Sequence, residues 1–288
     1  MQRSKVYFTN EIAPDTMIKM YDLLGVRPSG KIAVKLHSGE VGNQNFVRPD
    51  FLQPIIDYVQ GVIVESNTAY SGKRSTTEEH WKTIKLHGWT DIAKVDIMDE
   101  EGDLELSIPD GICIKKNYVG SHMENYDFLL VLSHFKGHPM GGFGGALKNI
   151  SIGMASSFGK AYIHGAGNPK EIWTSDHDSF LESMADASSS IMNYYKENIA
   201  FISIMNNMSV DCDCCEDAED PKITDIGILS SLDPVALDQA CIDLVYSSDD
   251  PGKKHLIERI ESRNGIHTVE SAAKLGVGTR EYELIKVD

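Results

Sequence analysis

The sequence predicts an α/β protein with two lobes, in which largely parallel sheets carry helices packed on their faces. Short apolar runs with the length of buried strands recur along the chain, and helix-like patterns stand between them. Parallel strands need crossovers of this kind, because a tight hairpin cannot join them. The rhythm breaks near residue 120, which predicts a boundary between residues 1–120 and residues 121–288.

In the first lobe, strands are expected at residues 4–9, 31–36 and 61–66, and helices at 15–24, 48–59 and 76–88. Pro49 suits the start of the second helix, where its missing N–H has no cost. Gly88 suits the end of the third, because glycine accepts a left-handed backbone. Residues 94–120 hold short β-like pieces and turns.

In the second lobe, strands are expected at residues 126–132, 199–205 and 225–231, and helices at 179–196, 233–246 and 267–278. Asp233 and Pro234 are typical of the first positions of a helix, as a cap and an N1 residue. The α/β pattern therefore continues to the end of the chain.

The composition excludes some partners. Lysine and arginine number 27 against 43 acidic residues, a formal net charge of −16, which disfavours nucleic acid and membrane surfaces. No run has the length of a membrane span or a signal peptide, and the five cysteines suit a reducing compartment. We expect a cytoplasmic protein that acts on a small anionic substrate or cofactor, with a homo-oligomer as an open alternative.

The segment Ser133–His164 follows a predicted strand and is rich in glycine, histidine and lysine. Glycines let backbone N–H groups approach a ligand closely, and loops at the carboxyl ends of strands are where α/β sheets bind ligands. The segment matches neither a Walker A loop nor a dinucleotide fingerprint. A tight structural turn is the alternative. The residues expected to bind an anion here are Lys136, Gly141, Gly142, Gly144, Gly145 and Lys148.

Three histidines of this segment, His134, His138 and His164, are candidates for proton transfer or metal binding. Gly137 and Pro139 argue against a helix that would place the first two on one face. A lone histidine is more often a satisfied structural residue, and that alternative stays open. With Lys148, these histidines are the predicted catalytic residues.

Cys212, Cys214 and Cys215 crowd into four positions within an acidic stretch. Neighbouring carboxylates keep thiols protonated unless a cation joins them, and a bound metal makes a coordinating thiol give up its proton. Soft thiolates select iron–sulfur clusters, zinc or copper(I). A solvated acidic turn and redox-active thiols are the alternatives. Cys113 and Cys241 lie in apolar patterns and are expected to be buried hydrophobic residues.

Two polar loops follow neighbouring predicted strands, at residues 37–48 and 66–74. They are expected to form a pocket wall that faces the glycine-rich segment. A guanidinium group binds carboxylate or phosphate through two hydrogen bonds. Ordinary turn chemistry is the alternative. The residues of these loops expected at the pocket are Arg48, Asn67, Thr68 and Arg74.

The spacing from His138 to Lys148 and on to His164, with GGFGG between the first two, resembles the signature of the nickel-pincer lactate racemase superfamily. In that superfamily the lysine matching Lys148 carries the pincer nucleotide. The histidine matching His164 binds nickel, and the one matching His138 moves protons.

A wider resemblance spans nearly the whole chain. The stretches KLHSGEVGNQNFVRP, ESNTAYSGKR, SHFKGHPMGGFGGALKN, MNNMSVDCDCC and DIGILSSLDPVALDQA look like the domain of unknown function 362. Members of that family are often described as iron–sulfur-binding, and many carry an inserted module with CxxCxxC runs. This chain has no such run and resembles the short form.

These observations predict a metal-cofactor protein, with an iron–sulfur cluster the leading expectation, that acts as a redox enzyme on a small anion. The expected metal ligands are Cys212, Cys214, Cys215 and His164. A racemase or isomerase with a lysine-tethered nickel cofactor is the first alternative. A non-catalytic protein with a structural zinc is the second.

Overall fold

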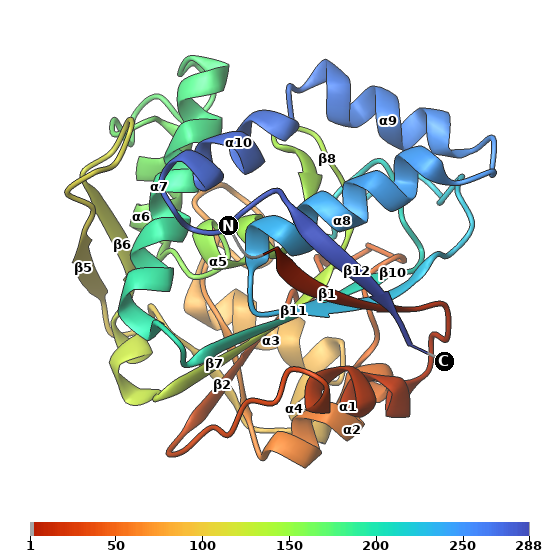
Figure 1. Ribbon diagram of the computed structural model, residues 1–288. Helices are drawn as coiled ribbons and strands as arrows, with labels where there is room; N and C mark the ends of the chain where they lie inside the picture. The colour runs from red at the N-terminus through yellow and green to blue at the C-terminus, as the bar shows by residue number, and fades with distance from the viewer. Residues whose placement is uncertain (1–2, 288) are drawn as a thin grey trace.

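The computed structural model describes residues 3–287, and within them most strands join one large sheet (Figure 1). The strands are β1 (Ser4–Thr9), β2 (Ile32–Lys35), β3 (Val62–Glu65), β4 (Val95–Ile97), β5 (Asp103–Ser107), β6 (Lys116–Gly120), β7 (Phe128–His134), β8 (Lys136–His138), β9 (Gly142–Gly144), β10 (Ile199–Met205), β11 (Gly227–Ser231) and β12 (Tyr282–Lys286).

Helices occupy most of the connections between these strands. They are α1 (Pro14–Asp22), α2 (Pro49–Val59), α3 (Thr77–Leu86), α4 (Trp89–Ile92), the 3-10 helix η1 (Ser121–Asn125), α5 (Ala146–Ser151), α6 (Ser157–His164), α7 (His177–Tyr195), α8 (Pro234–Ser247), α9 (Lys253–Ser262) and α10 (Ile266–Lys274).

The large sheet has eight strands in the order β12-β1-β11-β10-β7-β2-β3-β4. Only β11 runs antiparallel to its neighbours, β1 and β10, and the other neighbouring pairs are parallel. Two short hairpins, β5–β6 and β8–β9, lie outside it. The predicted α/β class with a largely parallel sheet is therefore confirmed.

Helices cover both faces of the sheet, so its central strands are apolar on both sides. In β7, Leu130 and Leu132 pack in the cluster that includes residues of α1 and α2, whereas Leu129 and Val131 pack in the opposite cluster with residues of α5 and α8. Successive side chains of a strand point to opposite faces, which explains this division. Figure 1 shows α1 to α4 on one side and α5, α7, α8 and α10 on the other.

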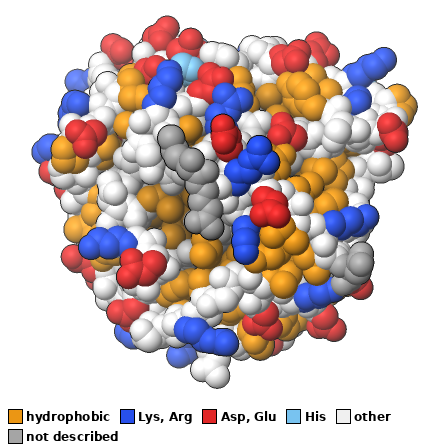
Figure 2. All heavy atoms as spheres, in the orientation of Figure 1, with side chains coloured by type: hydrophobic (Ala, Val, Ile, Leu, Met, Phe, Trp, Pro, Cys, Tyr) orange, Lys and Arg blue, Asp and Glu red, His pale blue; other side chains and the backbone are white. Residues whose placement is uncertain are grey.

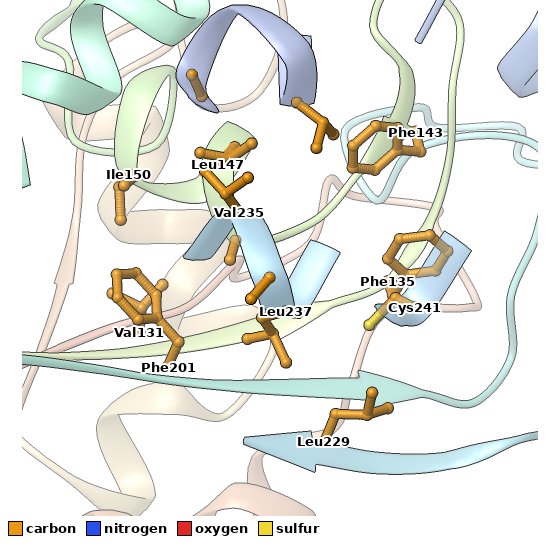
Figure 3. Packing of buried hydrophobic residues seen from close by; sticks show 14 of the residues in the cluster. Val131, Phe135, Phe143, Leu147, Ile150, Phe201, Leu229, Val235, Leu237 and Cys241 are labelled. Atoms are coloured by element: carbon orange, nitrogen blue, oxygen red, sulfur yellow. The ribbon is translucent and has the colours of Figure 1, made fainter. Parts of the chain in front are cut away.

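Cys241 belongs to the core on the α8 side. Figure 3 shows it among Phe135, Leu229 and Leu237, and it has no solvent exposure. Its surroundings are apolar, as the sequence predicts for a small buried hydrophobic residue. It therefore takes no part in the cysteine cluster at residues 212–215.

Strands from residues 1–120 and from residues 121–288 lie side by side in the large sheet. β1 lies between β12 and β11, and β2 lies beside β7. The two predicted lobes therefore share a single sheet instead of having one each. Their division near residue 120, in the connection between β6 and β7, stays a prediction.

The described residues contain no helix that is both long and apolar enough to span a bilayer. On the face drawn in Figure 2, acidic and basic side chains are interspersed and no large area carries a single sign of charge. The more unusual charges of this protein lie inside it, at one edge of the sheet.

Candidate metal and anion site

A polar cavity lies beyond the carboxyl ends of three neighbouring parallel strands, β2, β3 and β7. The carboxyl ends of parallel strands meet at one edge, which is the usual ligand site of open α/β sheets. The space open to the centre of a water molecule is about 60 Å³, room for roughly four to six waters. The strand ends contribute Lys35, His37, Glu65, Ser66, Ser133 and His134 to its wall.

Cationic side chains dominate this cavity. Four of them are buried and one, Lys148, is half-buried. Three have a carboxylate partner, and two have none. The three ion pairs are Lys35 with Glu65 at 2.6 Å, Arg74 with Glu40 at 3.2 Å, and Lys136 with Asp213 at 2.6 Å.

The two cations without a carboxylate are Lys148 and Lys160. Across residues 3–287, no carboxylate oxygen lies within 4.0 Å of either Nζ atom. The Lys148 Nζ lies 3.7 Å from the Cys212 Sγ, and the thiols raise the pKa of Lys148 against the effect of burial. Burial lowers the pKa of Lys160 to about 7. An unpaired charge is costly in such a place, so the cavity favours an anion.

Arg74 carries a buried hydrogen-bond donor that is not satisfied by the described residues. It is 3% exposed, and its Nε donates to Glu40 at 3.2 Å, but its Nη2 is buried with no hydrogen-bond partner among residues 3–287. A buried donor left without an acceptor costs about 1–3 kcal/mol. Because Arg74 lines the cavity, an oxygen of a bound anion is the natural acceptor.

One imidazole and two thiols come together beside this cavity. The ligand atoms of His138, Cys212 and Cys214 all lie within 4.8 Å of one another, so this group can hold a metal ion. His138 comes from the β8–β9 hairpin and the cysteines come from the loop between β10 and β11. Both segments extend from the carboxyl ends of parallel strands, β7 and β10, which brings them together.

Cys215 lies outside this group, although it was predicted with the other two. Its backbone faces residues 37–48, since Asn43 Nδ2 donates to the carbonyl oxygens of Cys215 at 2.8 Å and Cys212 at 3.3 Å. The Glu40 amide also donates to the Asp213 carbonyl at 2.8 Å. The loop after β2 therefore holds the cysteine loop in shape through its backbone.

The hydrogen bonds of two histidines fix which ring nitrogen carries the proton. His138 Nδ1 accepts from the Gly141 amide at 2.8 Å and the Met140 amide at 3.2 Å, so its proton is on Nε2. His164 Nδ1 donates to the Lys160 carbonyl at 2.7 Å, so its Nε2 keeps a lone pair. Burial lowers the pKa of His138 to about 4 and that of His164 to about 3. At the cavity, the Nε2 of His138 is therefore a hydrogen-bond donor and the Nε2 of His164 is an acceptor.

His134 has a different environment. Its Nδ1 lies 2.9 Å from the Asp213 carboxylate and its Nε2 lies 2.6 Å from the Asn206 carbonyl, so both nitrogens are occupied. Asp213 also binds Lys136, and the pKa of its carboxyl stays low despite burial because His134 and Lys136 surround it. These contacts tie the cysteine loop to β7 and β8, and a role of His134 in proton transfer stays a prediction.

The four predicted anion-binding glycines separate into two pairs. Gly144 and Gly145 line the cavity, whereas Gly141 lies in the β8–β9 turn and Gly142 begins β9, both beside Gly265. The first amides of α5, at Ala146 and Leu147, donate to the buried Asp238 carboxylate at 2.7 and 2.9 Å. These two amides are therefore not free to bind a ligand.

The polar loops place some predicted residues at the cavity and others elsewhere. Thr68 and Arg74 line it. Asn67 instead bonds Thr77 at 2.9 Å and His80 at 3.2 Å. Arg48 is exposed, with its guanidinium carbon 4.0 Å from the centroid of the Phe46 ring.

Sequence reasoning missed several residues of the wall. Lys35 and Glu65 end predicted apolar strands, and a charge inside such a run was the available signal. Asp213 stands among other acidic residues and nothing local distinguishes it. The other residues missed at the cavity include Ser66, Ser133 and Asn149, whereas His37, Tyr70 and Lys160 are polar candidates within segments that the sequence already singled out.

The fold and this cavity define an α/β protein with a buried cationic site and a Cys/His group able to hold a metal. The chain belongs to the family called domain of unknown function 362, whose model matches residues 32–243, more than half of the chain. The family resemblance predicted from the sequence is thus confirmed. No curated protein matches the chain.

Two solved structures are similar to this chain. The lactate racemase apoprotein from Thermoanaerobacterium thermosaccharolyticum is 15% identical with a TM-score of 0.41, and the match covers 70% of this chain and 51% of that one. A protein from Thermotoga maritima is 13% identical with a TM-score of 0.45, over 91% of this chain and 58% of its own. The chain matches just over half the length of each.

Proposed function

We propose that this protein is an enzyme that binds a thiophilic metal ion at His138, Cys212 and Cys214 and a small organic anion in the adjoining cavity. The observation that supports this most is the joining of these three donors to a cavity with unpaired cations. Either feature alone has structural explanations. Together they indicate that a metal ion and an anionic substrate bind next to each other.

The donor set fits a single metal ion better than an iron–sulfur cluster. Two thiolates and an imidazole suit zinc or nickel. A four-iron cluster usually takes four cysteines, and only two thiols belong to this group. When bound, such an ion supplies Lewis-acid or redox chemistry. We therefore place a mononuclear metal above the cluster expected from the sequence.

The other residues of the cavity have separate tasks. Arg74 would bind the anion through its free Nη2, and Lys148 would balance the charge of thiolate and substrate. His164 can accept a proton at Nε2. A metal at His138 replaces the proton on Nε2 and deprotonates both thiols, so metal affinity should increase with pH.

A second candidate is an isomerase with a lysine-tethered nickel cofactor, as the His138–Lys148–His164 spacing suggests. The position of Lys148 favours it, because its amine lies beside Cys212 and has no carboxylate partner. This candidate predicts a mass increase on the peptide that contains Lys148. We also propose a cytoplasmic location, since five free cysteines suit a reducing compartment.

Metal analysis of anaerobically purified protein tests the proposed function. We expect about one metal ion per chain, and at least a tenfold loss of affinity in Cys212→Ser and Cys214→Ser. Cys215→Ser is the matched control and should keep the metal, because its side chain lies outside the donor group.

Three results would contradict the proposal. One is wild-type protein that is purified without any bound metal, and another is an equal loss of metal affinity in all three serine variants. The third is a brown iron–sulfur spectrum that needs Cys215. A colourless zinc protein that unfolds when a chelator is added would support the structural-zinc alternative instead.

A further inference from the structure

Lys160 differs chemically from the other cationic residues of the cavity. Lys35 and Lys136 each donate to a carboxylate, and Lys148 lies beside a thiol. Lys160 has only neutral partners: its Nζ lies 2.6 Å from the Ser66 Oγ and 2.6 Å from the Ala155 carbonyl oxygen. Nothing among these contacts stabilises a positive charge through an ion pair.

Its surroundings instead favour the neutral amine. The side chain is 6% exposed, and burial is the largest influence on its charge state. The positive charges of Lys35 and Arg74 also favour the neutral amine, while the carboxylates of Asp99 and Glu65 oppose it. Burial and neighbouring cations together are the conditions that activate a lysine as a nucleophile. They lower the pKa of Lys160 to about 7, so near neutral pH a large fraction is unprotonated.

The geometry leaves the lone pair of this amine available. A neutral amine has two N–H bonds, and Ser66 and Ala155 provide two acceptors for them. The remaining position on the nitrogen is the lone pair, on a side chain that lines the cavity. Ser66 contacts the amine and also lines the cavity, so its hydroxyl can relay a proton from the amine to a bound molecule.

We propose that Lys160 forms an imine with the carbonyl group of a small 2-oxo acid whose carboxylate binds the free Nη2 of Arg74. The Lys160 nitrogen attacks the carbonyl carbon, and one amine proton passes through Ser66 to the carbonyl oxygen. The second amine proton then leaves with that oxygen as water, and a carbon–nitrogen double bond remains. No oxidant or reductant is consumed.

The size and charge of the cavity fit this class of substrate. Room for roughly four to six waters corresponds to an acid of about three carbons, and Lys148 together with the free Nη2 of Arg74 favours an anion. The inference rests on the anion site of the proposed function but not on its metal. The two can therefore fail separately.

Borohydride trapping tests the inference on the full chain. The protein is incubated with pyruvate and sodium borohydride, and the modified peptide is located by mass spectrometry. We expect one reduced adduct at Lys160, at least tenfold less adduct in Lys160→Arg, and an undiminished amount of adduct in the control Lys82→Arg, which replaces an exposed lysine of α3. Acetone, which has the carbonyl but no carboxylate, should label at least tenfold less than pyruvate.

The yield should increase from pH 6 to pH 8, as Lys160 loses its proton. Peptide mapping of the wild-type protein locates the adduct even if a variant fails to fold. Absence of an adduct overturns the inference, and so does labelling at Lys148 or equal labelling of many surface lysines. Metal content measured on the same samples, with and without chelator, separates this result from the fate of the metal proposal.

Discussion

Lys35 and Lys160 show two ways in which a lysine is buried beside the same cavity. Lys35 is 1% exposed and keeps a carboxylate, Glu65, at 2.6 Å. Lys160 has hydroxyl and carbonyl partners only. A buried charge with a good ion pair is tolerable, whereas an uncompensated one lowers stability or loses its proton. Lys160 should therefore limit the stability of the fold near neutral pH.

We expect Lys160→Met to raise the free energy of unfolding at pH 7 by roughly 2–4 kcal/mol. The folded pKa of about 7 lies below the ordinary lysine pKa of 10.5, so between these values the unfolded chain binds more protons. Wild-type stability therefore increases with pH across that window. The advantage of the methionine variant should shrink from pH 7 to pH 10, as measured by urea unfolding.

Lys82→Met is the matched control for this variant. Lys82 is an exposed lysine that pairs with Glu78 and Glu79 on the surface of α3. Exposed pairs contribute little, so its replacement should change stability by less than about 1 kcal/mol at either pH. A destabilised Lys160→Met protein at pH 7 would show that the amine is well accommodated when charged.

For single residues, the sequence predicts the chemical role of a side chain better than it predicts which residues that side chain contacts. Cys212, Cys214 and His138 were predicted from their chemistry, and the structure brings them together. Asp213 could not be singled out, because its role depends on Lys136 and His134 more than 70 positions away. The burial of Lys160 was equally hard to predict, since lysines are mostly exposed and its hydroxyl partner, Ser66, is 94 positions away in the sequence.

Helix α5, which carries Lys148, is held in place by a side chain of another helix. α5 has six residues, and its first amides donate to Asp238 of α8 instead of to a residue of its own loop. Gly145 lies directly against that carboxylate: a Cβ there would lie 2.3 Å from Asp238 Oδ1. The glycine is therefore required for close packing of α5 on α8.

Gly145→Ala should lower the free energy of unfolding by about 1–3 kcal/mol, because the added methyl group pushes α5 away from Asp238. It should also weaken metal retention through displacement of Lys148. Gly144→Ala is the matched control, since a Cβ there would meet only the flexible side chains of Lys136 and Lys148 at 3.4 Å or more. Equal effects of the two substitutions on the urea midpoint would contradict this explanation.

Most elements were predictable from apolar periodicity, and the misses have physical causes. The predicted strands at residues 126–132 and 199–205 are confirmed as β7 and β10, and the helix at 233–246 as α8. α6 was not predicted, and it contains a glycine, which weakens helix propensity. Gly159 is needed because a Cβ there would lie 1.8 Å from the Tyr118 carbonyl oxygen. That contact depends on the tertiary fold.

For the molecule as a whole, net charge and local charge have opposite signs at the cavity. The chain carries −16, while cations outnumber their carboxylate partners around the site. An anionic substrate is therefore repelled at long range and attracted only at the cavity. Salt screens the long-range part more strongly than the buried part.

Removal of residues 279–288 tests whether the cavity is independent of the β12 edge of the sheet. It deletes β12, which pairs with β1, and also the bond from Tyr282 to Asp243. We expect a decrease in Tm of several degrees and self-association through the exposed β1 edge. Metal content should stay near that of the full chain, because the cavity lies at β2, β3 and β7. Calorimetry, size-exclusion chromatography and metal analysis measure these quantities.

Loss of the metal together with the strand would contradict this independence. It would show that the large sheet behaves as one cooperative unit, so that loss of β12 also disrupts the cavity. An unchanged Tm would show instead that β12 adds nothing to the fold.

The position of β1 between β11 and β12 also has a consequence for biosynthesis. β1 leaves the ribosome long before either of its neighbours, and the wait until β11 follows it takes on the order of ten to forty seconds at usual translation speeds. During that time the centre of the sheet can assemble while the N-terminal segment waits, a natural client for chaperones on the nascent chain.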